Sequence, residues 1–173
     1  MINNVPGSAR SLHTFEQKGT GVRRFTALVS ALFFALLSGF ILAPSASAAG
    51  YGCSGSQIDT YAVKTSGGTT YSNIYLYYDS STGKNCAVNV RTAAGGYGTS
   101  TQAIDVQLWR CVAGSTPGAK CATDGAIQGD YGWYQQYAGP VSITASNRCI
   151  TLFAQTHHND VWAKRTLNAV HCG

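Results

Sequence analysis

Apolar and polar residues alternate along much of the chain after residue 50, which is the pattern of β-strands that bury one face. In segment 71–79, Ile74 and Leu76 lie on one side of an extended strand, and Tyr75 and Tyr77 lie on the other. Segment 102–110 alternates in the same way. Further strands are predicted at 86–91, 140–144 and 149–155, and with weaker alternation at 58–64 and 162–171.

The spacing of these segments predicts the fold class. About seven short strands are separated by turns rich in Gly, Ser and Asn, and no helical periodicity is sustained after residue 50. The arrangement is typical of an all-β fold, a small antiparallel β-sandwich or barrel.

The Gly83–Lys84 pair follows small hydroxyl residues, as in a phosphate-binding loop, but the surrounding residues do not fit. Tyr78 stands where such a loop needs its first glycine, Asn85 stands where it needs Ser or Thr, and a strand follows instead of a helix. We therefore expect the stretch from Ser80 to Asn85 to be a hairpin turn, with Gly83 supplying a positive φ angle.

The first 49 residues differ from the rest. Arg23 and Arg24 precede an uncharged apolar run at 25–43, and small residues follow it at 45–50. This order predicts a secretory signal peptide, cut after Ala48 or Ala49 and preceded by an N-terminal extension. An uncleaved membrane anchor is the alternative to cleavage. A true translation start near Val22 is the alternative to an N-terminal extension. The remaining residues, 50–173, are predicted to form a single domain.

Six cysteines follow the predicted cleavage site, and an even number in an exported chain indicates disulfides. A short loop containing Pro117 and Gly118 separates two of them, which favours a bridge across it. Each bridge would stabilise the fold by about 2–4 kcal/mol. The favoured pair is Cys111–Cys121, with Cys53–Cys86 and Cys149–Cys172 as the next choices.

Nucleic acid is not an expected partner. The whole chain has a formal charge of +5, but four of its twelve basic residues and only one of its seven acidic residues precede residue 50. Residues 50–173 therefore carry +2, without the basic stripe that would neutralise phosphates.

We expect no catalytic residues, metal site or cofactor. His157 and His158 are adjacent, so they point to opposite faces of a strand unless the backbone turns there. No nucleophile-elbow sequence is present, and the aspartates are scattered along the chain. Polar turn residues are thus the simpler interpretation of the histidines, although a secreted hydrolase or enzyme inhibitor remains an alternative function.

The segment 131–137, with the sequence YGWYQQY, is the best candidate for a binding site. If exposed, Trp133, Tyr134 and Tyr137 can stack on sugar rings, and large exposed aromatic residues often mark interaction surfaces. Aromatic residues beside a strand are more often part of a core. A carbohydrate-binding module is therefore a competing function.

Several stretches together resemble the secreted spore-associated proteins of filamentous actinobacteria. They are Gly52–Ser56, the sequence YLYYDSSTGKNCAVNVR at 75–91, YAGPV at 137–141, Cys149–Ile150 and the terminal VHCG at 170–173. The resemblance implies a small exported protein found with aerial hyphae and spores, without an enzymatic activity or catalytic residues to carry over. This chain departs from the family at 105–129, a segment that is longer than expected for the family and contains the additional Cys111 and Cys121.

Pattern, cysteines and resemblance together predict a secreted, non-enzymatic protein of the spore or cell surface. The expected partner is a polysaccharide or protein of the cell wall or spore surface. We expect a monomer that does not associate with the membrane once the signal peptide has been removed.

Overall fold

The computed structural model describes residues 50–173. The predicted signal peptide and its N-terminal extension lie outside the described residues, so the domain boundary at residue 50 stays a prediction. Within the described part of the chain, no helix is long and apolar enough to cross a membrane.

The described residues form strands joined by turns and two short 3-10 helices, η1 (Gly50–Gly52) and η2 (Ala93–Gly95). The predicted all-β fold, stapled by disulfides, is confirmed. The eight strands are β1 (Ser56–Lys64), β2 (Thr70–Asp79), β3 (Lys84–Arg91), β4 (Ile104–Arg110), β5 (Gln128–Gly132), β6 (Tyr137–Thr144), β7 (Ile150–His158) and β8 (Val161–Val170).

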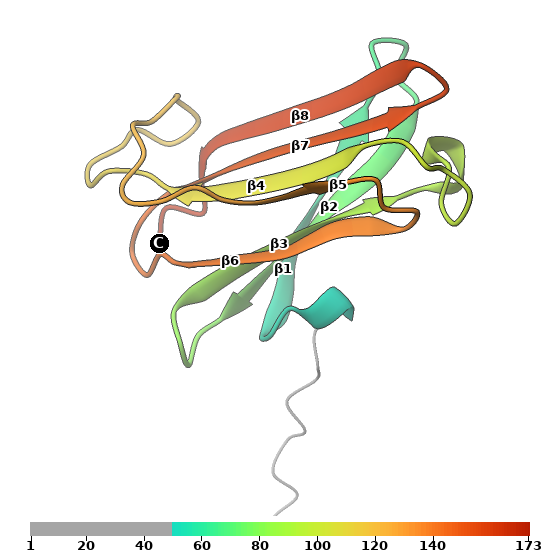
Figure 1. The fold of residues 1–173 in the computed structure, drawn as a ribbon. Helices are drawn as coiled ribbons and strands as arrows, with labels where there is room; N and C mark the ends of the chain where they lie inside the picture. The colour runs from blue at the N-terminus through green and yellow to red at the C-terminus, as the bar shows by residue number, and fades with distance from the viewer. Residues whose placement is uncertain (1–49) are drawn as a thin grey trace, which may run out of the picture. The chain divides into compact units, whose positions relative to one another are not determined.

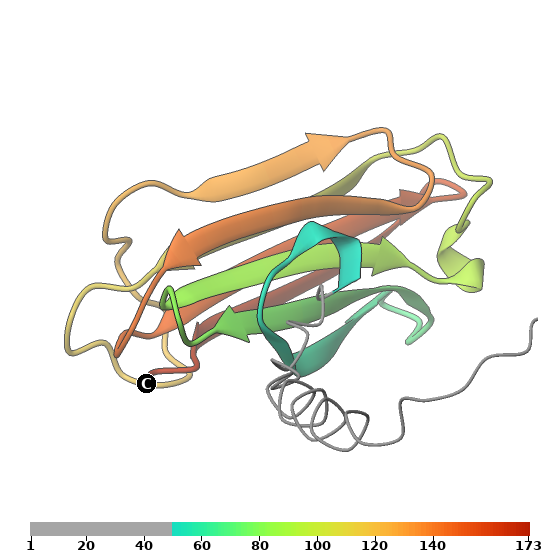
Figure 2. The same ribbon diagram turned by 90° about the horizontal axis from the view of Figure 1, so that it is seen from below.

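The strands belong to one antiparallel sheet with the order β5-β4-β7-β8-β1-β2-β3-β6. The sheet bends into two layers, and its edge strands β5 and β6 lie side by side, so that the barrel is nearly closed (Figures 1 and 2). We call β5, β4, β7 and β8 the front layer and β1, β2, β3 and β6 the back layer. Between β1 and β8 the layers are joined by one residue pair, Lys64 and Lys164.

The main core lies between the two layers. Ile74 and Leu76 of β2 face Ile104, Val106 and Leu108 of β4, and all five are fully buried. Each of these residues occupies an alternate position of its strand, so one face of β2 and one face of β4 enter the core. The predicted alternation is therefore the direct cause of the layered packing.

A second, smaller core covers the outer face of the back layer. Tyr77, Val88 and Val90 are buried there although they point away from the main core. Segment 50–53 lies over them, held by the disulfide between Cys53 and Cys86. The 3-10 turn η1 thus converts an outer sheet face into a buried one.

All six cysteines form disulfides, and the pairs are the three that the sequence favoured. The 111–121 bridge closes a loop of the front layer, and the 149–172 bridge ties the chain end after β8 to the start of β7. The pairs are Cys53–Cys86, Cys111–Cys121 and Cys149–Cys172.

The structure departs from the predicted strands in three places, at β5, β6 and β7. β7 continues to His158, three residues beyond its predicted end, so His157 and His158 lie in the strand and not in a turn. β5 was not expected, because Gly129 and Gly132 weaken any strand signal in its sequence; it forms by pairing with β4. β6 begins at Tyr137, three residues before the predicted strand. The predicted hairpin is present, and Gly83 has the expected positive φ, 65°.

Candidate binding site

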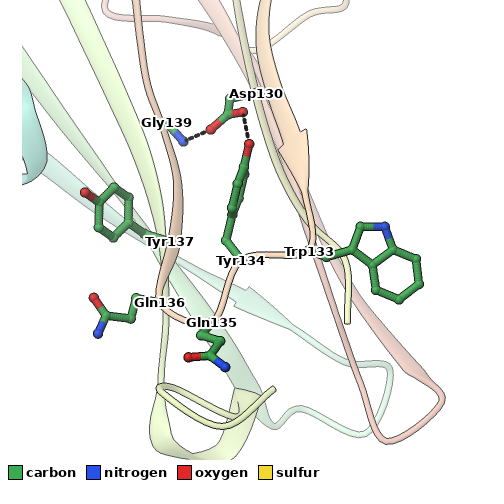
Figure 3. Close-up of a pocket in the computed structure, with 7 residues that line it drawn as sticks. All are labelled: Asp130, Trp133, Tyr134, Gln135, Gln136, Tyr137 and Gly139. Carbon is green, nitrogen blue, oxygen red and sulfur yellow. Dashed lines mark hydrogen bonds between the residues drawn. The ribbon is translucent and has the colours of Figure 1, made fainter. Parts of the chain in front are cut away.

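A cavity of about 550 Å³ opens where the chain passes from β5 to β6. Figure 3 shows the side chains that border it, which come from the end of β5, the connection 133–136 and the start of β6. The lining combines one carboxylate, two amides and three aromatic rings: Asp130, Trp133, Tyr134, Gln135, Gln136, Tyr137 and Gly139.

Asp130 holds the two walls of this cavity together. Its carboxylate accepts a hydrogen bond of 2.9 Å from the Tyr134 hydroxyl and one of 2.6 Å from the backbone N–H of Gly139. Gly139 has φ 104°, where a side chain would be strained and would press on the carbonyl of Ala87. The hydrogen bond to Asp130 raises the pKa of Tyr134 above its ordinary value.

The three aromatic residues predicted to bind sugar border the same cavity but point in different directions. Trp133 is 69% exposed and projects away from the side on which Tyr134 lies (Figure 3). Tyr137 turns to the outer face of the back layer, where its ring meets that of Tyr51 with centroids 5.2 Å apart. Trp133 and Tyr134 are therefore the more accessible pair, and Tyr137 packs against the second core.

Arg91 fixes the backbone of this connection from inside the protein. It is only 3% exposed, and its backbone N–H donates to the carbonyl of Gln136 over 2.9 Å. Its guanidinium Nε donates to the carbonyl of Tyr134 over 3.0 Å. Burial lowers its pKa, although such a group stays charged at neutral pH. The other guanidinium nitrogens donate to the carbonyls of Gly95, Gln102, Ala103 and His157.

Sequence reasoning missed the roles of Arg91 and Asp130. The available signal for Arg91 was a charged residue at the end of a strand predicted to bury Val88 and Val90. Asp130 stands only three residues before Trp133. Neither spacing reveals which backbone groups the side chains reach, because β3, β5 and the 133–136 connection meet only in the folded chain.

The histidines do not come together. His157 stacks on Trp162 with ring centroids 4.5 Å apart, and His158 meets the edge of the Tyr71 ring. In residues 50–173, no three His, Cys, Asp or Glu side chains are arranged to hold a metal ion.

His171 is the one histidine of the described residues that pairs with an aspartate. Its Nε2 lies 3.5 Å from an oxygen of Asp59 and 3.0 Å from the hydroxyl of Tyr61. The Tyr61 hydroxyl donates to Asp59 over 2.5 Å, and this bond is the main reason why the pKa of Asp59 is lowered. His171 also borders a cavity of about 430 Å³, whose lining within residues 50–173 contains no serine. The cluster ties β1 to the chain end after β8.

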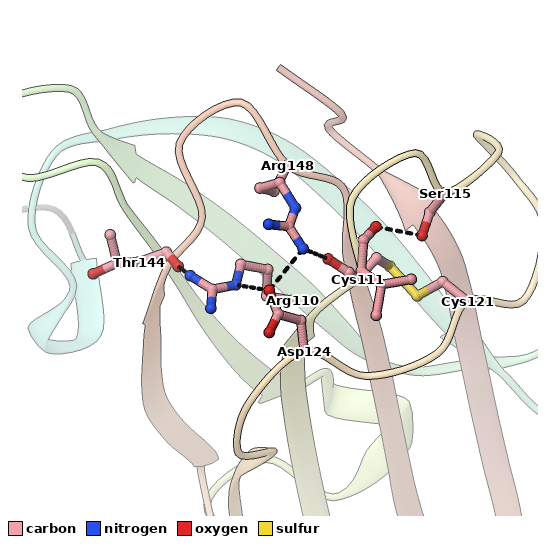
Figure 4. A network of polar contacts seen from close by, with 8 residues as sticks. Arg110, Cys111, Ser115, Cys121, Asp124, Thr144 and Arg148 are labelled. Atoms are coloured by element: carbon pink, nitrogen blue, oxygen red, sulfur yellow. Dashed lines mark hydrogen bonds and ion pairs between the residues drawn. A yellow bond between two sulfur atoms is a disulfide. The ribbon is translucent and has the colours of Figure 1, made fainter.

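A network of ion pairs anchors the disulfide-closed loop at the opposite end of β4 (Figure 4). An oxygen of Asp124 lies 3.1 Å from Nε of Arg110 and 2.7 Å from Nη2 of Arg148. Arg148 also donates to the carbonyl of Cys111. Because each charged group is already paired, this network has a structural role, holding the 111–124 loop against the strands.

The chain is similar to spore-associated protein A of Streptomyces coelicolor. The two are 36% identical over 77 residues, which are 44% of this chain and 40% of the relative. The match thus spans less than half of the relative's length. The resemblance to spore-associated proteins is confirmed over this portion. No known family model matches the chain, and no solved structure matches it.

Proposed function

We propose that this protein is exported and attaches to a cell or spore surface by binding a polysaccharide, without catalysing a reaction. The observation that carries the proposal is Trp133, a 69% exposed indole beside a cavity lined by a carboxylate and two amides. An exposed indole costs solubility unless it has a partner, and sugar rings offer the apolar C–H faces that stack on it.

The polar lining suits a hydroxyl-rich ligand. The amides of Gln135 and Gln136 can both donate and accept hydrogen bonds, as sugar hydroxyls do. The backbone of the connection is held in place before any ligand arrives, by Arg91 beneath it and by Asp130 across it. Such preorganisation lowers the entropic cost of binding.

Disulfides and similarity support export. Three disulfides are typical of proteins from oxidising compartments outside the cytoplasm. The similar protein carries a name that associates it with spores. An extracellular or surface location is consistent with both.

The arrangement of the titratable side chains supports a binding role over a hydrolytic one. A serine hydrolase needs a nucleophile, a base and an orienting acid that converge on one point. The pairing of His171 with Asp59 supplies a base and an acid, but their nearest hydroxyl partner is the phenol of Tyr61. A phenol already bonded to a carboxylate is poorly suited to act as a nucleophile.

Retention on insoluble polymers tests the proposal. The purified protein, residues 50–173 with its disulfides intact, is incubated with chitin, cellulose and peptidoglycan, and the bound fraction is measured. We expect retention on at least one polymer, and we expect Trp133→Ala to weaken it about tenfold, the effect of losing a central aromatic contact.

Trp162→Ala is the matched control, because Trp162 is also exposed but lies on β8, away from the cavity. It should be retained like the unmodified protein. Absence of retention on all three polymers, or equal retention of Trp133→Ala, would overturn the proposal.

A further inference from the structure

The outer face of the front layer is open, in contrast to that of the back layer. In antiparallel pairing, residues directly opposite each other project from the same face. Tyr131 of β5 is opposite Asp105 of β4, and Asp105 is opposite Gln155 of β7. One row of side chains therefore crosses three strands on the face that turns away from the main core.

The next row along the strands carries a second amide. Gln107 of β4 is opposite Phe153 of β7 on one side and Gly129 of β5 on the other. Because Gly129 has no side chain, the Gln107 side chain lies against the β5 backbone there, and a Cβ on Gly129 would come within 3.3 Å of its Cγ. Tyr131, 57% exposed, lies two residues along β5 from Gly129, on the same face and at the edge of the sheet.

Asp105 orients the two amides. Its Oδ2 accepts a hydrogen bond of 3.0 Å from Nε2 of Gln107 and one of 3.2 Å from Nε2 of Gln155. With both nitrogens turned toward the carboxylate, each amide keeps its oxygen and its second N–H for another partner. Within the described residues, neither amide has a further hydrogen bond.

Asp105 is poorly placed for stability. It is 2% exposed, its Oδ1 has no hydrogen-bond partner, and no Lys or Arg of the described residues forms an ion pair with it. A buried carboxylate without a cation destabilises a fold, and a neutral residue of the same size would serve packing as well. Residues that cost stability in this way are characteristic of functional sites.

We infer that the outer face of β5, β4 and β7 is a second sugar-binding surface, on which Gln107 and Gln155 hydrogen-bond a neutral polysaccharide beside the ring of Tyr131. Asp105 is a positioning residue, since it acts through the two amides. The inference rests on the proposed function, and it extends the contact from Trp133 and the cavity onto the sheet.

The chemistry of the face selects the ligand class. Two amides held side by side match the paired hydroxyls of a sugar ring, and the exposed phenol ring of Tyr131 matches its C–H face. The carboxylates of Asp105 and Asp130 disfavour an anionic chain. Adjacent strands lie about 4.8 Å apart, so the row from Tyr131 to Gln155 spans about 10 Å, the length of roughly two sugar units.

Titration calorimetry with soluble oligosaccharides tests the inference. Chitohexaose and cellohexaose are the neutral probes, and polygalacturonate is the anionic one. The double variant Gln107→Ala/Gln155→Ala should bind the neutral probe at least about tenfold more weakly, since it loses both amides. The matched control, Gln57→Ala/Gln128→Ala, removes two exposed glutamines outside this face and should bind like the unmodified protein.

Asp105→Asn separates positioning from simple structural support. It should weaken binding several-fold, because it perturbs the orientation of the amides, while the melting temperature stays equal or rises. If binding and melting temperature fall together, Asp105 has a structural role and its assignment is wrong.

The outcomes distinguish this inference from the proposed function. If Trp133→Ala loses binding and the glutamine double variant does not, the sheet face is not a binding surface and the proposed function stands. If no polymer or oligosaccharide binds the unmodified protein, both fail. Tighter binding of polygalacturonate than of either neutral probe would overturn the ligand class.

Discussion

The two outer faces of the sheet begin from similar sequence patterns and reach different states. β2 of the back layer places Tyr75 and Tyr77 on its outer face, and the front layer places Tyr131 and Phe153 on its own. On the back layer, η1 and the Cys53–Cys86 bridge bury Tyr77 in a second core, against which the partly buried Tyr75 packs. On the front layer, Tyr131 stays exposed.

The difference shows that a cover and the side chains beneath it together decide which aromatic face is buried. The covered face contains Val88 and Val90 between its tyrosines, whereas the open face contains Asp105 and the two glutamines. Apolar neighbours gain from being covered, and hydrogen-bonding side chains remain able to bind a partner.

Releasing the cover of the back layer, which is η1 held by the Cys53–Cys86 bridge, should have the largest effect on stability. In Cys53→Ser/Cys86→Ser the free energy of unfolding should fall by about 2–4 kcal/mol, because a bridge spanning 33 residues no longer restrains the unfolded chain. Urea unfolding measures the loss, and tyrosine accessibility to acrylamide should rise. Cys111→Ser/Cys121→Ser, which opens a span of only 10 residues, should cost less. An equal or larger loss in that control would contradict the special role of the cover.

On the open face, removing the charge of Asp105 should stabilise the protein, whereas removing the cover of the back layer destabilises it. Burial raises the pKa of Asp105 above its ordinary value of 3.8; the hydrogen bonds from Gln107 and Gln155 oppose the shift, and the charge of Asp130 adds to it. As pH rises above 3.8, the unfolded chain releases this proton first, so Asp105 increasingly destabilises the fold until its raised pKa is passed.

Asp105→Asn lacks this penalty. We expect it to be more stable than the unmodified protein by about 1–3 kcal/mol at pH 7, the usual cost of an unsatisfied buried group, and to lose most of this advantage near pH 3. Thermal melts across this pH range measure the difference. A constant difference at all pH values would show that the pKa of Asp105 is the same in the folded and the unfolded protein, and that burial does not penalise its charge.

The seam between the two layers, which is the pairing of β1 with β8, should give the smallest effect on the free energy of unfolding. Lys64 of β1 is directly opposite Lys164 of β8, and like charges in this position repel. Lys64→Glu should raise the free energy of unfolding by about 0.2–1 kcal/mol, and salt should reduce the gain. Lys120→Glu, in the exposed 111–121 loop, is the control. A gain as large in the control would mean that net charge, and not the seam, is responsible.

The sequence predicted much of the fold because the relevant signal is local. Alternation at 71–79 and 102–110 identifies strands without knowledge of their partners, and Gly83 marks the turn between β2 and β3. β5 escaped prediction since its glycines carry no strand signal, and its conformation depends on pairing with β4.

For the candidate site, the sequence identified the segment but not its geometry. The cluster at 131–137 does border a cavity, but Trp133 and Tyr137 point to different sides of it. The direction of each ring depends on where β5 ends and β6 begins, and both limits are set by pairing with strands distant in the chain. Whether these residues bind sugar stays a prediction.

By itself, then, the sequence determined the fold class, the favoured disulfide pairs and the resemblance to spore-associated proteins, because each depends on residue type and spacing along the chain. Only the tertiary structure decided which aromatic face is covered, that Arg91 supports the connection at Tyr134, and that Asp105 joins Gln107 to Gln155. These relations depend on strand order and register, which bring together residues up to 50 positions apart.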